Sequence, residues 1–119
     1  MEHRGHKHHK ERLGEALREE IACIVAGELR DPRVAAATVT EVMLFPDGKS
    51  AYVWVAVEGG ERDGEQALAG LSNASGYIRH EIAERLTLRR SPELIFQLDK
   101  SQQYETRIDQ LLRRIQRGR

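Results

Sequence analysis

The sequence predicts an α+β domain in which one small sheet is covered on one face by helices. Three observations lead to this prediction. Apolar residues recur every three or four positions in separate stretches, which is typical of amphipathic helices. Two β-branched and aromatic runs flank a turn, and a third short alternating run follows later. The chain has 119 residues, which is enough for one domain with its own core.

A first helix is predicted from about Glu11 to Arg30, because its apolar residues share one helical face: Leu13, Leu17, Ile21, Ile24, Val25 and Leu29. Pro32 should end this helix, since proline cannot donate to a continuing hydrogen-bond ladder. Residues 1–10 contain little that could be buried, and we expect them to form a flexible arm rich in His, Lys and Arg. A single domain is then predicted over residues 11–117.

A β-hairpin is predicted next, from Val34 to Phe45 and from Ser50 to Glu58, around the turn sequence PDGK. On its second strand, alternation separates an aliphatic side from a side that carries Tyr52 and Trp54. The aliphatic side should face the helices. The aromatic pair could stack RNA bases, but we expect a half-buried pair shielded by the last helix or by Ile95.

The second helical region contains weak helix formers at its centre, in the string LSNASGYIRHEI from Leu71 to Ile82. Glycine, serine and asparagine each disfavour a helix interior, so we expect two helices that meet at a kink and pack closely there. The preceding string GGERDG is predicted as a loop. A short strand within SPELIFQLD and an arginine-rich closing helix from about Tyr104 to Ile115 complete the order.

Charge is balanced overall, with 19 basic and 19 acidic residues, but it is unevenly distributed along the chain. Residues 13–75 carry five basic against eleven acidic groups, whereas residues 76–119 carry ten against six. This asymmetry could place a cationic face against phosphate. A single cysteine, Cys23, precludes an internal disulfide, and no apolar run approaches membrane-spanning length, so a soluble, cytoplasmic protein is expected.

Four strings in this order and spacing resemble the bacterial ribosome-binding factor A family: ELRDPRV, FPDGKSAYVWV, ASGYIRHEIAERLTLRRSPELIF and YETRIDQLL. The resemblance implies a type II KH-like fold with the order α-β-β-α(kink)α-β-α. It also implies that Ala74, Ser75 and Gly76 form the interhelical kink that replaces the usual Gly-x-x-Gly loop. No two glycines of this sequence are three residues apart, so that loop cannot be present.

The resemblance further implies a non-enzymatic assembly factor that binds the small ribosomal subunit and its rRNA during late maturation. The resemblance also implies roles in rRNA processing and in growth in the cold. No cofactor, metal, membrane or small-molecule substrate is expected, and the protein should act as a monomer.

Basic side chains are the candidates for RNA contact, because phosphate contacts supply most of the affinity for nucleic acids. The main candidates are Arg79, Arg85, Arg89, Arg90 and Arg107. Arg33 is a weaker candidate, and the arm and the start of the first helix add Lys7, Lys10 and Arg12. On spacing alone, a solvated helix face is the favoured interpretation of the same arginines.

The sequence contains no complete catalytic motif. HEIAE, from His80 to Glu84, lacks the second histidine of a zinc-binding helix. A hydrolase that uses His80 and Glu81 is a third hypothesis, and it predicts that His80→Ala abolishes the activity. The histidines of the arm lack a further ligand on a rigid element, so no metal site is predicted. The alternative to RNA binding is a protein-interaction module whose acidic middle segment docks a basic partner.

Overall fold

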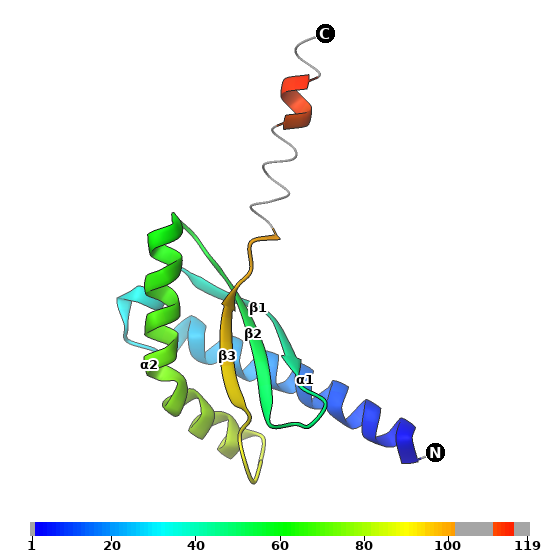
Figure 1. Ribbon diagram of the computed structural model, residues 1–119. Coiled ribbons are helices and arrows are strands. Elements are labelled where there is room, and N and C mark those ends of the chain that lie inside the picture. Colours follow the sequence, from blue (N-terminus) through cyan, green and yellow to red (C-terminus); the bar gives the residue numbers. More distant parts are fainter. Residues whose placement is uncertain (1, 102–110, 116–119) are drawn as a thin grey trace.

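One three-stranded sheet forms the centre of the computed structural model, which describes residues 2–101 and 111–115, with the backbone alone over residues 2–10 (Figure 1). The strands are β1 (Ala37–Leu44), β2 (Ser50–Val57) and β3 (Glu93–Leu98), in the spatial order β1-β2-β3. β2 runs antiparallel to β1 and parallel to β3. The helices α1 (Glu2–Gly27) and α2 (Glu61–Arg85) pack on the same face of the sheet, and the short 3₁₀ helix η1 (Pro32–Val34) precedes β1. The predicted α+β class is therefore confirmed.

Strand alternation places the aliphatic side of β2 under the helices, as the sequence predicted. Ala51, Val53 and Val55 are completely buried, whereas Tyr52 and Trp54 between them are partly exposed on the opposite face. A strand sends successive side chains to opposite faces, so the register of the sheet fixes the same division for β1 and β3.

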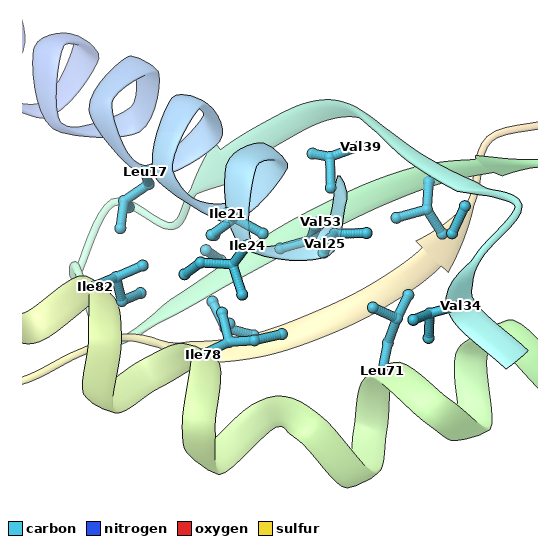
Figure 2. Close-up of a cluster of buried hydrophobic side chains, with 14 of the residues drawn as sticks. Leu17, Ile21, Ile24, Val25, Val34, Val39, Val53, Leu71, Ile78 and Ile82 are labelled. Carbon is cyan, nitrogen blue, oxygen red and sulfur yellow. The ribbon is translucent and has the colours of Figure 1, made fainter. Parts of the chain in front are cut away.

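The core lies between this aliphatic face and the two helices (Figure 2). α1 contributes Leu17, Ile21 and Ile24, and α2 contributes Leu71, Ile78 and Ile82, all of them fully buried. α1 lies mainly against β1, and α2 lies against β3 and η1. The apolar stripes recognised in the sequence are thus the surfaces that hold both helices on the sheet.

α1 differs from its predicted bounds at both ends. It begins at Glu2 rather than near Glu11, so the backbone of residues 2–10, predicted as an arm, extends the helix. Once a helix has formed, each further residue adds a hydrogen bond at low cost, and this stretch contains no proline. The helix ends at Gly27 instead of Arg30. Asp31 then caps the separate turn η1 by accepting a hydrogen bond from the Arg33 N–H at 2.9 Å.

α2 is one continuous helix, which corrects the prediction of two helices separated by a kink. Ala74, Ser75 and Gly76 lie inside it, and its ribbon changes direction about half way along its length (Figure 1). The bend is therefore taken up within an unbroken helix. α2 also begins earlier than predicted, at Glu61 inside the expected loop, because the Asp63 carboxylate accepts a hydrogen bond from the Gly60 N–H at 2.8 Å.

The close approach expected at Gly76 occurs at Gly70 instead. A Cβ atom at Gly70 would lie 2.9 Å from Val34 Cγ1 and 3.1 Å from an Asp31 carboxylate oxygen, whereas one at Gly76 would meet nothing within 4 Å. Gly70 is thus the position at which η1 packs directly on the backbone of α2. Gly76 faces open space, and no close contact explains its presence.

Two glycine-to-alanine substitutions should therefore have opposite effects on stability. Gly70→Ala should lower the free energy of unfolding by about 1–2 kcal/mol, because steric overlap with η1 outweighs the better helix propensity of alanine. Gly76→Ala should raise it by up to about 1 kcal/mol, since alanine fits there without contact. Urea unfolding of both variants measures this difference, and equal effects of the two substitutions would contradict the packing of η1 on Gly70.

Candidate nucleic-acid interface

Several basic residues meet at one end of the sheet, which we call the basic end. β1 ends where β2 and β3 begin, because Leu44 pairs with Ala51 and Ser50 pairs with Glu93. The hairpin turn at 45–49 and the connection at 86–92 therefore lie together. The Glu93 N–H donates to the Lys49 carbonyl at 2.8 Å, which fixes the two segments to each other. Sequence reasoning missed Lys49, because its proximity to Arg89 and Arg90 depends on the parallel pairing of β2 and β3.

Arg79 is held at this same end by hydrogen bonds to the 86–92 connection. Its guanidinium donates to the Ser91 carbonyl at 3.0 Å, and the Ser91 hydroxyl donates to the Arg79 carbonyl. Ser91 follows Arg90 directly, so α2 and the connection bring Arg79, Arg89 and Arg90 into one region. The structure thus brings together three of the predicted RNA contacts.

Arg89 and Arg90 are exposed, and their side chains make no hydrogen bond or ion pair with other residues in the described part of the chain. Thr87 ends α2 in a left-handed conformation, with φ at 54°, and the Leu88 N–H then returns to the Ala83 carbonyl at 2.8 Å. A β-branched residue rarely adopts this conformation, and such strain is concentrated at functional sites. The sharp turn places Arg89 and Arg90 just before the start of β3, where no acidic side chain of the described residues pairs with them.

Arg12 lies at the side of the basic end, where α1 passes the end of β1. Together with Arg18 it lines an open groove of about 740 Å³, whose other lining residues include Glu15, Glu41 and Met43. Acidic and basic side chains alternate there. The groove is therefore of mixed charge.

Arg85, by contrast, lies in an ion-pair cluster that connects α2 to α1. Its guanidinium contacts both carboxylate oxygens of Glu28, lies 3.0 Å from Glu81 Oε1 and 3.5 Å from Glu20 Oε2. Tyr77 completes the cluster by donating to Glu28 Oε1 at 3.1 Å. Hydrogen bonding to Arg85 lowers the pKa of Glu28, and the carboxylates in turn raise the pKa of Arg85. The positive charge predicted to face RNA is compensated within the protein.

Loss of this cluster should weaken the fold in a pH-dependent way. The pKa of Glu28 is lowered in the folded state, so its contribution to stability is present above the ordinary pKa of a glutamate and is lost as the pH falls through the lower folded pKa. Arg85→Met should therefore be less stable than the wild type at pH 7, and this deficit should shrink by pH 3. Urea unfolding at both pH values measures it, with Arg62→Met on the same helix as control. A deficit of equal size at both pH values would contradict the assignment.

Arg33 also has a local partner. Its guanidinium contacts both oxygens of the Asp31 carboxylate, with the shorter N–O distance at 2.6 Å. This hydrogen bonding lowers the pKa of Asp31. Arg33 and Asp31 together stabilise the turn that packs on Gly70. This structural role explains why both residues are present, and it requires no bound RNA.

The other predicted residues are only partly described or are not described. Arg107 and most of the predicted closing helix lie outside the described residues, although residues 111–115 are helical. Lys7 and Lys10 are placed in α1 by their backbone alone. His80 and Glu84 pair across one helical turn at 3.6 Å.

The described residues contain neither a candidate metal-binding cluster nor a helix that could span a membrane. No group of three His, Cys, Asp or Glu side chains in this part of the chain could hold a metal ion. None of the helices described is both long and apolar enough to cross a membrane.

Comparison with known proteins assigns the chain to a family. The profile of the family "Ribosome-binding factor A" matches residues 9–112. The ribosome-binding factor A of Koribacter versatilis is 56% identical over 115 residues, which cover 97% of this chain and 94% of that protein.

Two structural relatives from Thermus thermophilus share the fold. The crystal structure of ribosome-binding factor A from this organism is 33% identical with a TM-score of 0.70, over 77% of this chain and 97% of that chain. A homology model of the Thermus thermophilus factor, fitted into a cryo-EM map of a 30S complex, is 35% identical with a TM-score of 0.57, over 77% of this chain and 92% of that chain. The chain of 119 residues therefore belongs to the ribosome-binding factor A family.

Proposed function

We propose that this protein is a non-enzymatic assembly factor that binds the small ribosomal subunit through its basic end. The observation that carries the proposal is the convergence of Arg89 and Arg90, without ion-pair partners in the described chain, with Lys49 and the tethered Arg79. Support also comes from the Thermus thermophilus relative, whose coordinates were fitted into a 30S complex. Binding to rRNA, a role in its processing and in the cold, a monomeric state and a cytoplasmic location belong to the same proposal.

The contacts we propose are with phosphate groups, because phosphate contacts from exposed arginine and lysine side chains supply most of the affinity for nucleic acids. Lys49, Arg79, Arg89 and Arg90 form the proposed contact set. Arg85 and Arg33 are left out of this set because Glu28 and Asp31 already bind them. Arg12, Lys7, Lys10 and Arg107 stay as additional predictions.

The proposed mechanism is selection among conformations of the subunit. A rigid protein that binds one conformation of the RNA better than another shifts the equilibrium by its difference in affinity, without a cofactor or a chemical step. Arg79 contributes to this rigidity. Its contact with Ser91 anchors the 86–92 connection, which contains Arg89 and Arg90, to α2. The backbone positions that carry Arg89 and Arg90 are thus fixed relative to α2, and an RNA surface can match their spacing.

Co-sedimentation with immature and mature small subunits from the same cells tests the proposed function. We expect more protein to bind the immature particle, and we expect binding to fall steeply as the salt concentration rises. Equal, weak association with both particles would contradict an assembly role. Binding that is unchanged by charge reversal at both Arg89 and Arg90 would instead favour the alternative, in which the acidic middle segment docks a basic protein.

A further inference from the structure

The face of the sheet opposite the helices carries an apolar surface, which we call the open face. Its centre is an aromatic row on β2 and the adjoining turn, in which the ring centroids of Phe45 and Tyr52 are 4.9 Å apart and those of Tyr52 and Trp54 are 5.3 Å apart. Met43 and Ile95 flank Tyr52 on the two neighbouring strands. Met43 is 48% exposed, so this surface is uncovered at its β1 edge.

A second apolar surface lies on the helical residues 111–115. Leu111, Leu112 and Ile115 are 56%, 52% and 59% exposed, and their spacing places them on one face of a helix. They are three of the five exposed large apolar side chains in the described chain, and Met43 on the open face is a fourth. Two uncovered apolar surfaces therefore belong to the same molecule.

Charge favours the pairing of these two surfaces. The three strands contain no lysine or arginine, and their acidic residues, Glu41 and Glu93, lie on the open face at its two edges. The helical residues carry Arg113 and Arg114 beside the apolar side chains. An acidic-edged apolar face matches a basic amphipathic helix, and it disfavours the phosphates of RNA.

The chain leaves β3 at the end of the sheet opposite the basic end, where Asp99 is tied to both β2 and β1. Asp99, directly after β3, continues the pairing by donating its N–H to the Val55 carbonyl at 2.7 Å. Its carboxylate accepts a hydrogen bond from the Thr40 hydroxyl of β1 at 2.7 Å, so it reaches across β2 to the far strand. The same carboxylate accepts from the Ser101 N–H at 3.0 Å, which fixes the position of Ser101 next to Asp99.

We propose that residues 111–115 dock on the open face of their own chain, with Leu111, Leu112 and Ile115 against Tyr52, Trp54 and Ile95. The nine residues that separate Ser101 from Leu111 can span about 30 Å, whereas a strand of six residues is about 20 Å long. Every part of the open face is thus within reach. Tethering also gives the segment a high effective concentration, which a separate partner lacks. The proposal is independent of the ribosomal function.

Trp54 tests the docking directly, because it is the single tryptophan of the chain and lies on the open face. In the full-length protein, we compare the wild type with a variant that combines Leu111→Ser, Leu112→Ser and Ile115→Ser. We expect Trp54 emission to move to longer wavelength and acrylamide quenching to increase about twofold when the apolar cover is lost. A matched control, Gln110→Ser with Gln116→Ser, should leave both unchanged.

A distance measurement separates docking within the chain from other causes. A nitroxide on Gln116→Cys, in a Cys23→Ser background, should broaden the NMR signal of the Trp54 indole N–H at every protein concentration. Unchanged fluorescence in the triple variant, or no broadening by the nitroxide, would overturn the proposal. Broadening that grows with protein concentration would also overturn it, because the occupant would then be a second copy. Circular dichroism checks that each variant keeps the fold.

Discussion

Ile82→Ala should lower the free energy of unfolding by about 2–5 kcal/mol. Ile82 is fully buried on α2, and Figure 2 places it among core residues that α1 and the sheet share. Alanine removes three carbon atoms from a site enclosed on several sides, so a cavity remains that the surrounding side chains only partly fill. A domain of this size has a total stability of about 5–15 kcal/mol, so the loss is a large fraction of it.

Equilibrium unfolding in urea measures this loss. His80→Ala on the same helix is the control, because the His80 side chain is 68% exposed, and a change within about 0.5 kcal/mol is expected there. A loss below about 1 kcal/mol for Ile82→Ala would mean that α2 is not held on the core as described.

Reversal of charge at Arg89 and Arg90 together should weaken binding to small ribosomal subunits by at least about tenfold, since hydrogen bonds to charged groups are each worth about 1.5–3 kcal/mol. The dependence of log affinity on log salt should also become shallower by about two, one for each phosphate group that is no longer bound. Both residues are exposed and outside the core, so the fold should be retained.

The matched control reverses two arginines away from the basic end. Arg30 lies in the connection from α1 to η1, and Arg62 lies in the first turn of α2, after the end of β2. Arg30→Glu with Arg62→Glu changes net charge as much as Arg89→Glu with Arg90→Glu. We expect the control to bind nearly as well as the wild type. Equal weakening in both pairs would show that net charge, and not the basic end, determines binding.

Most of the fold could be predicted from local pattern. The three- and four-residue spacing of Leu17, Ile21 and Ile24 identified the buried face of α1, and alternation in β2 separated Val53 from Trp54 correctly. Boundaries were harder to predict, because α1 and α2 extend into polar segments that carry no apolar periodicity. Helix elongation and the Asp63 cap determine those ends.

The glycines illustrate why contacts across the chain could not be predicted. Weak helix formers around Gly76 indicated a distortion, and α2 does bend, but the tight contact lies six residues earlier at Gly70. Nothing near Gly70 in sequence shows that Val34 packs on it, because that contact depends on how η1 folds back. Helix propensity indicates the local energetic cost of a residue in a helix. It does not indicate which distant residue packs against that position.

The candidate interface shows the same limit. The sequence placed several arginines in one part of the chain, but it could not show that Glu28 and Glu81 bind Arg85 while Arg89 and Arg90 lack such partners in the described residues. It also could not place Lys49 beside them, since the parallel pairing of β2 and β3 joins segments about forty residues apart. Exposed, uncompensated charge is a property of the folded arrangement.

Site-specific photo-crosslinking tests the central claim most directly. A photoreactive amino acid replaces Arg90 in one protein and Arg62 in another, each is bound to small ribosomal subunits, and the RNA attached after irradiation is quantified. We expect strong crosslinking to rRNA from position 90 and little from position 62. Crosslinking from position 62 with none from position 90 would contradict the assignment of the basic end as the ribosomal contact.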